Sequence, residues 1–159
     1  QLDRFLLCLR MGYPGFAAER EIATRFLAGD PLARVNPVMT SDEMQVLRQA
    51  VSSTHFAIPV LEYALSIARA TREMKEVRLG ASPRGALALA RAARALAAVR
   101  GRHFVLPDDV QDLAVPALVH RIIPDIDSAL YGARGPDLVR LAMDRVPVPT
   151  GDFAPNSNE

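Results

Sequence analysis

Only one segment of this chain has the pattern of a β-strand, and it stands at the N-terminal end. Residues 2–13 are mostly apolar, with apolar side chains at every second position from Phe5 to Met11 and a Gly-Tyr-Pro-Gly turn sequence that begins at Gly12. A single strand is not stable without a sheet, and the remaining sequence offers helical patterns. We therefore expect an all-α fold, a helical bundle with one short N-terminal β-strand whose sheet lies in a segment upstream.

Helix signals follow this segment along the chain. Thr40 and Glu43 have the spacing of a capping box, and Ser82-Pro83 combines a capping hydroxyl with a proline at the first helical position. The helix over residues 59–74 is apolar on most of its surface, so we expect it at the centre of the core. Together, apolar spacing and helix starts predict helices over residues 16–27, 41–52, 59–74 and 83–101, from 107 onward with a kink or break at Pro116, and over 136–145.

Charge and cysteine content limit the class of protein. Nineteen basic and eighteen acidic residues give a net charge of +1, which argues against a nucleic-acid or membrane partner. The single cysteine, Cys8, excludes an internal disulfide and fits a reducing compartment. No apolar run reaches membrane-spanning length. These features predict a cytoplasmic protein.

Several kinds of catalytic site are missing from the sequence. A phosphate-binding P-loop needs Gly-Lys-Ser/Thr, but the only lysine, Lys75, lies between Met and Glu. His55, His103 and His120 have no cysteines or spaced carboxylates that would complete a zinc site, so we predict no metal site. Cys8 lies inside an apolar run, which is typical of a packed thiol rather than a nucleophile. This part of a protein is therefore not expected to be an active enzyme by itself.

Two arginines stand out by their positions. Arg84 falls in the first turn of a predicted helix, where the helix dipole disfavours a cation by roughly 0.3–1 kcal/mol and free backbone N–H groups attract anions. Gly85 beside it would leave room for a ligand or a backbone. Arg4 precedes the apolar run, and its planar donors suit a phosphate. The alternatives are a solvated or ion-paired Arg84 and an Arg4 that pairs with Asp3.

Taken together and in order, several motifs resemble the C-terminal part of the MoxR family of AAA+ ATPases. The resemblance covers about residues 1–149, nearly the whole chain, and its Gly-Ala-Ser-Pro-Arg run is rather specific. The motifs are Gln1-Leu2-Asp3-Arg4-Phe5, Gly12-Tyr13-Pro14, Ala70-Thr71-Arg72, Leu79-Gly80-Ala81-Ser82-Pro83-Arg84-Gly85, Gly101-Arg102-His103-Phe104-Val105, Pro107-Asp108-Asp109-Val110 and Leu118-Val119-His120-Arg121-Ile122.

The resemblance implies roles for both arginines. Arg4 would be the catalytic arginine finger, which reaches the nucleotide of the neighbouring subunit. Arg84 would be sensor 2, which binds the nucleotide held by its own subunit. ATP and Mg²⁺ would serve the parent protein, without tight binding to this part of it. One departure is Leu106, which stands where the family's helix start has a capping Thr or Ser.

The resemblance also implies a domain order and partners. Residues 1–13 would end the AAA+ core, 14–39 would connect, 40–149 would form the helical lid with sensor 2, and 150–159 would be a disordered tail. The partners would be the missing AAA+ core, neighbouring subunits of a hexameric ring, and a von Willebrand factor A domain protein. The implied function is to sense bound ATP and to couple its hydrolysis to chaperone-like remodelling or maturation of a client.

Two other functions remain open on the residues alone. One is a free-standing helical protein-interaction module that binds no nucleotide. The other, a helical DNA-binding module, is less favoured because the arginines are dispersed and the net charge is near zero. An in-frame Gly-x-x-x-x-Gly-Lys-Ser/Thr motif upstream would favour the ATPase lid over the interaction module.

Overall fold

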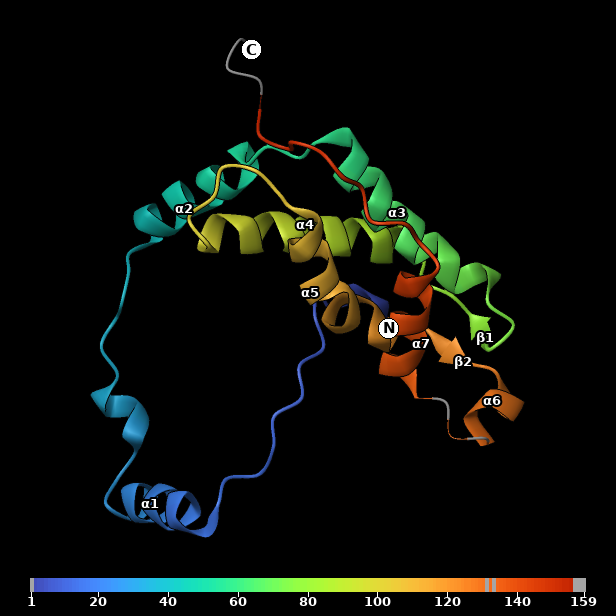
Figure 1. Ribbon diagram of the computed structural model, residues 1–159. Helices are drawn as coiled ribbons and strands as arrows, with labels where there is room; N and C mark the ends of the chain where they lie inside the picture. The colour runs from blue at the N-terminus through green and yellow to red at the C-terminus, as the bar shows by residue number, and fades with distance from the viewer. Residues whose placement is uncertain (1, 131, 133, 156–159) are drawn as a thin grey trace. The chain divides into compact units, whose positions relative to one another are not determined.

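The computed structural model describes residues 2–130, 132 and 134–155, and this part of the chain is mostly helical (Figure 1). The predicted all-α fold is confirmed, and its only sheet within these residues is a short antiparallel pair. The elements in chain order are η1 (Leu2–Arg4), α1 (Phe16–Leu27), η2 (Pro31–Arg34), α2 (Ser41–Ser53), α3 (Ile58–Glu73), β1 (Val77–Leu79), α4 (Pro83–Val99), α5 (Pro107–Leu118), η3 (Val119–Arg121), β2 (Ile123–Pro124), α6 (Ile126–Leu130) and α7 (Gly135–Asp144), where η is a 3₁₀ turn.

The chain divides into two compact units. One comprises Gln1–Cys8 and Gln49–Glu159, and the other is Leu9–Arg48. The second unit holds α1, η2 and the start of α2, and it buries none of its side chains. Its capping box is present as predicted, because the amide of Thr40 donates to the Glu43 carboxylate at 2.7 Å and the Glu43 amide donates to the Thr40 hydroxyl at 3.2 Å. This pair of bonds fixes the start of α2.

The N-terminal β-strand that the sequence predicts is not formed. Leu2–Arg4 is a 3₁₀ turn, and the chain from Phe5 to Tyr13 has no strand partner among the described residues. The physical reason is that a strand needs a neighbouring strand to satisfy its backbone hydrogen bonds, and none lies beside this segment among the described residues. Phe5 and Leu9 remain 64% and 73% exposed, and Cys8, which we expected to be packed, is also exposed.

The core lies between α3, α4, α5 and α7. Helix α4 packs against both α3 and α5, and α7 packs against the same two helices (Figure 1). Helix α3 contributes one face to this core, where six of its sixteen residues are buried. Ile58 and Leu65 on its other side are 63% and 41% exposed, so α3 flanks the core rather than occupying the centre that the sequence suggested. The alanine-rich face of α4 lets its neighbours approach closely. The largest fully buried apolar side chains of this core are Ile67, Leu89, Leu118, Val60, Val105, Val110 and Val139.

A buried carboxylate joins the end of α4 to the start of α5. Asp109 is fully buried and accepts hydrogen bonds from Arg100 at 2.9 Å, from Arg102 at 2.7 Å and from the backbone amide of Leu106 at 2.9 Å. Burial alone would raise the pKa of this carboxyl, but the bonds from Arg102 and the Leu106 amide outweigh it and lower the pKa. Leu106 gives α5 no side-chain cap, as the sequence indicated. The carboxylate of Asp109 instead accepts a hydrogen bond from the Leu106 amide, one of the backbone N–H groups left free at the helix start.

Helix α5 and the C-terminal segment differ in detail from the sequence-based predictions. Helix α5 passes through Pro116, predicted as a kink or break, and ends two residues later, where η3 begins. Phe153 is buried in the core cluster, although the segment from Thr150 was expected to be disordered; residues 156–159 of that segment lie outside the described residues. Among the residues that the structure describes, no helix has the length and apolar character that crossing a membrane requires.

Candidate functional site

The first turn of α4 carries one of the two predicted site residues. Ser82 caps this helix, because its hydroxyl accepts a hydrogen bond from the amide of Gly85 at 3.3 Å, and Pro83 occupies the first helical position. Both features match the sequence-based prediction of the helix start. Arg84 therefore lies in the first turn, and its side chain is exposed to solvent.

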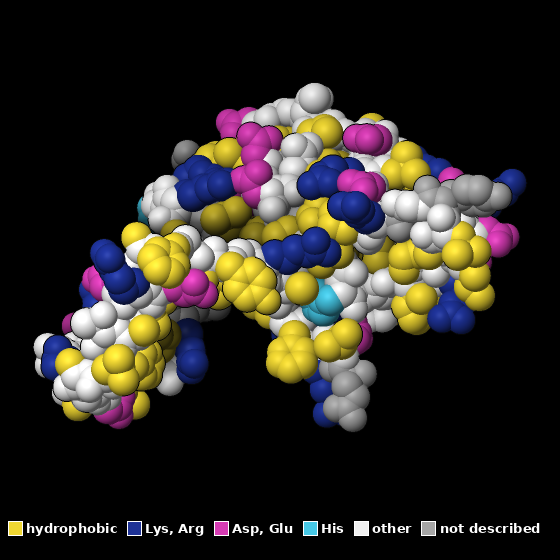
Figure 2. All heavy atoms as spheres, turned by 90° about the horizontal axis from the view of Figure 1, so that it is seen from below, with side chains coloured by type: hydrophobic (Ala, Val, Ile, Leu, Met, Phe, Trp, Pro, Cys, Tyr) yellow, Lys and Arg dark blue, Asp and Glu magenta, His cyan; other side chains and the backbone are white. Residues whose placement is uncertain are grey.

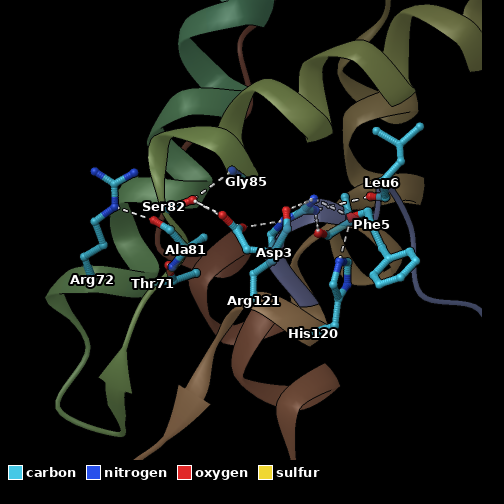
Figure 3. A network of polar contacts seen from close by, with 11 residues as sticks. Asp3, Phe5, Leu6, Thr71, Arg72, Ala81, Ser82, Gly85, His120 and Arg121 are labelled. Carbon is cyan, nitrogen blue, oxygen red and sulfur yellow. Dashed lines mark hydrogen bonds and ion pairs between the residues drawn. The ribbon is translucent and has the colours of Figure 1, made fainter. Parts of the chain in front are cut away.

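The Ala-Thr-Arg motif at the end of α3 holds the start of α4 in place. The hydroxyl of Thr71, which is fully buried, accepts a hydrogen bond from the amide of Ala81 at 2.9 Å. The Nε of Arg72 donates to the carbonyl oxygen of Ala81 at 2.6 Å (Figure 3). Gly80 is close to the backbone of Arg72, where a Cβ atom would lie 2.7 Å from the Arg72 Cα. The end of α3 thus fixes the peptide that precedes Ser82.

A buried arginine attaches the N-terminal residues to α5 and η3. The side chain of Arg121 is only 2% exposed, and a buried guanidinium needs a partner for each of its five N–H groups. The structure supplies all five acceptors from two parts of the chain (Figure 3). They are Asp3 Oδ1 at 2.9 Å from Nε, the carbonyl oxygens of Leu6 and Ala117 on Nη1, and those of Asp3 and Phe5 on Nη2.

Asp3 also contacts the start of α4. The hydroxyl of Ser82 donates to Asp3 Oδ2 at 3.1 Å, while Asp3 Oδ1 pairs with Arg121 (Figure 3). The alternative considered for Arg4, an ion pair with the adjacent Asp3, is not what the structure shows. Within the described residues Arg4, Arg84 and Arg91 form no ion pair.

The two predicted site residues, Arg4 and Arg84, line the same cleft. It has a volume of about 830 Å³ and is called the arginine cleft below. Arg91, two helical turns after Arg84 on the same face of α4, lines it too. Its lining residues are Asp3, Arg4, Leu6, Arg84, Leu87, Ala88, Arg91 and Arg121. Since Asp3 is paired with Arg121, the cleft presents three guanidinium groups without an ion-pair partner, an arrangement suited to an anion.

Gly85 has a different role from the one the sequence suggested. We expected it to leave room for a ligand or a backbone, but a Cβ atom at this position would lie 3.0 Å from Cδ of Arg121. The absence of a side chain at Gly85 therefore leaves space for the aliphatic part of the Arg121 side chain, which packs against α4 at this position. Sequence reasoning missed the role of Arg121, although the residue stands in one of the matched motifs.

The charged side chains of the described region also bear on two other kinds of feature, a metal site and a continuous basic surface. Among the described residues, no group of three or more His, Cys, Asp or Glu side chains lies close enough together to hold a metal. On the face shown in Figure 2, basic side chains alternate with apolar and acidic ones and form no continuous basic surface.

Comparison with known proteins identifies the class of this fold. The sequence pattern of the AAA lid domain matches residues 69–136. The crystal structure of a candidate ATPase from Cytophaga hutchinsonii superimposes with a TM-score of 0.82 over 94% of this chain and 48% of that protein, at 23% sequence identity. At that identity the likeness supports the fold alone. The chain therefore carries the helical lid of an AAA+ ATPase.

Sequence relatives narrow the class to a family. The uncharacterized protein YeaC of Bacillus subtilis is 37% identical over 94% of this chain and 47% of its own length. Chaperone MoxR1 of Mycobacterium tuberculosis is 32% identical over 87% of this chain and 38% of its own length. Protein MoxR of Paracoccus denitrificans is 43% identical over 46% of this chain and 22% of its own length. The sequence thus matches the lid-bearing C-terminal part of MoxR-type AAA+ ATPases, and the chain spans less than half the length of these relatives.

Proposed function

We propose that this lid responds to ATP bound by an AAA+ core, through Arg4 as an arginine finger and Arg84 as sensor 2. The observation that carries the proposal is that both guanidinium groups line the arginine cleft. Residues 1–13 would then belong functionally to the end of the core, 14–39 to the connection, and 40–149 to the lid. The matches to the AAA lid domain and to MoxR proteins support this assignment.

The shared cleft changes one feature of the expected mechanism. The family resemblance suggested that Arg84 binds its own subunit's nucleotide while Arg4 reaches the neighbour's. Two arginines that line one cleft can bind the same anion, and we propose that both act on a single nucleotide. Because an arginine finger acts across a subunit boundary, that nucleotide is the neighbour's.

The chemistry assigned to the two arginines is electrostatic. The core would hold ATP with Mg²⁺, whose contribution is to neutralise and orient the phosphates. Arg4 and Arg84 would add positive charge where the terminal phosphoryl oxygens gain negative charge during transfer to water. Both side chains are exposed in this chain, so a partner surface must exclude water from the cleft before either arginine reaches full effect.

A nucleotide held between two subunits would also link the state of the site to movement. When the terminal phosphate leaves, the anion that draws the arginine cleft towards the neighbour is lost, and the lid is released. In a ring of such subunits, this motion would drive chaperone-like remodelling or maturation of a client. A von Willebrand factor A domain protein is the proposed partner that selects the client.

The test uses the full-length ATPase. Arg4→Ala and Arg84→Ala should each lower kcat roughly 10³-fold, the size expected for loss of an arginine that stabilises the transferred phosphoryl group. Arg69→Ala is the matched control, because Arg69 is exposed on α3 and pairs only with Glu73. Wild-type turnover in both variants would contradict the proposal.

Mixed rings decide on which nucleotide Arg84 acts. Subunits with Arg84→Ala and an intact core are combined with subunits whose P-loop lysine is mutated but whose Arg84 is intact. If Arg84 acts on the neighbour's nucleotide, some boundaries regain a complete site and turnover recovers. If it acts on its own subunit's nucleotide, no boundary is complete and the mixture stays inactive.

A further inference from the structure

One hydrogen bond joins the residue before Arg4 to the cap of the helix that carries Arg84, and a second joins it to Arg121 in η3. Asp3 directly precedes Arg4 and accepts hydrogen bonds from Ser82 at 3.1 Å and from Arg121 at 2.9 Å. Ser82 lies two residues before Arg84 and caps its helix. One carboxylate therefore holds the backbone next to Arg4 against the backbone next to Arg84.

Arg121, which bonds to Asp3, has a side chain that is held in one position by its surroundings. Its guanidinium is planar and almost fully buried, and its five N–H groups all have acceptors in the structure. Its aliphatic part passes below α4 where Gly85 leaves space. A flexible surface arginine would not fix the position of Asp3, whereas this one is held on every side.

We propose that Asp3, Ser82 and Arg121 form a latch that sets the position of the Arg4 guanidinium relative to that of Arg84. The three are positioning residues for phosphoryl transfer, and this inference rests on the proposed function of the two arginines. Without the latch, each arginine remains present but the pair is no longer preformed for one phosphate group. Precise positioning of charged groups has large effects on rate, since a misplacement of about 1 Å can cost roughly 100-fold.

The contacts that follow Asp3 show why the latch can be opened selectively. His120 Nε2 lies 3.0 Å from the carbonyl oxygen of Phe5, and the amide of Cys8 donates to the carbonyl oxygen of Pro116 at 2.8 Å. Loss of the Asp3 carboxylate leaves both of these attachments intact. The bonds from Arg121 to the carbonyl oxygens of Asp3 and Phe5 remain as well. A change at Asp3 should therefore uncouple the Arg4 segment from the Ser82 cap without detaching that segment from Arg121.

The first test observes the latch itself in this chain. The Nε–H group of Arg121 is buried and bonded to Asp3, so its NMR signal should exchange slowly with water. In Asp3→Ala the exchange should become at least about tenfold faster, because the acceptor is removed and water enters. Asp144→Ala, a change of an exposed aspartate on α7, is the matched control. Equally fast exchange in the wild-type chain and Asp3→Ala would overturn the latch.

The second test measures catalysis in the full-length ATPase. Asp3→Ala should lower kcat roughly 10- to 100-fold and leave KM for ATP within about twofold, because the core supplies most nucleotide contacts. Ser82→Ala should have a smaller effect in the same direction, since Arg121 still holds Asp3. Asp144→Ala should keep wild-type kinetics.

A double-mutant cycle separates the latch from the proposed function. If Asp3 acts through Arg4, adding Asp3→Ala to Arg4→Ala should lower kcat no further. Full activity of Asp3→Ala beside an inactive Arg4→Ala would overturn the latch and leave the proposed function standing. Full activity of Arg4→Ala would instead contradict the proposed function. The latch would then have no catalytic role, even if the Nε–H group of Arg121 exchanged faster in Asp3→Ala.

Discussion

The hydroxyl of Thr71 and the amide of Ala81, ten residues apart in the sequence, meet at 2.9 Å in the interior of the lid. The same hydroxyl donates to the carbonyl oxygen of Ala68 at 2.7 Å, so one side chain joins the last turn of α3 to the peptide before the Ser82 cap. This contact connects the Ala-Thr-Arg motif to the Gly-Ala-Ser-Pro-Arg motif. The first motif holds the backbone from which the second begins its helix.

Thr71→Val should therefore destabilise the chain although it hardly changes the side-chain volume. Valine cannot accept the hydrogen bond from Ala81, and a buried amide without a partner costs about 1–3 kcal/mol. Urea unfolding followed by circular dichroism measures the difference. Thr71→Ser keeps the hydroxyl and should lose less stability than Thr71→Val; equal losses would show that the methyl group, not the hydrogen bond, is what matters.

Asp109 should make stability depend on pH in the acid range. Its pKa lies below the ordinary value of 3.8 because its hydrogen bonds, led by those from Arg102, outweigh the effect of burial. Above pH 3.8 the carboxyl is ionised in both folded and unfolded chains, and its stabilisation is complete. As the pH falls below 3.8, the unfolded chain takes up the proton first, so the stabilisation decreases and is lost below the folded pKa.

Asp109→Asn tests this assignment. At neutral pH the variant should be less stable by about 1–3 kcal/mol, a value kept modest because Arg100 and Arg102 still contact solvent. Its loss relative to wild type should shrink as the pH falls from 4 towards 2. Asp112→Asn is the control, because Asp112 bonds to Arg100 at 2.6 Å but its side chain is 52% exposed. A pH-independent difference between wild type and Asp109→Asn would contradict the assignment.

Local signals in the sequence were sufficient to predict most of the helices. The Thr40–Glu43 capping box and the Ser82-Pro83 start both depend on residues within three positions of each other, and both form as expected. The strand predicted for residues 2–13 failed because strand formation depends on a neighbour that periodicity cannot reveal. The sequence did not predict the pair β1–β2. Its strands have three and two residues, which is too short to show the alternation of apolar and polar side chains that marks a strand.

The candidate site was predicted only in part. Arg4 and Arg84 could be singled out from motifs, but nothing in the sequence indicated that one cleft contains both. That depends on the Asp3–Arg121 pair, whose members are 118 residues apart. Gly85 illustrates the same limit, because its small size was visible in the sequence while the side chain that fills the space was not.

The chain alone should bind ATP with Mg²⁺ weakly or not at all, even though the arginine cleft suits a phosphate. Its arginines are exposed, and pairs between exposed charges contribute little in water because solvent screens them. The sequence also lacks a P-loop, whose backbone amides and lysine supply most phosphate contacts in such ATPases. Isothermal calorimetry should show no binding at micromolar concentrations, and any millimolar binding should weaken with salt and be lost in Arg4→Ala/Arg84→Ala. Micromolar affinity that survives this double substitution would mean that the chain binds nucleotide at a place other than the arginine cleft.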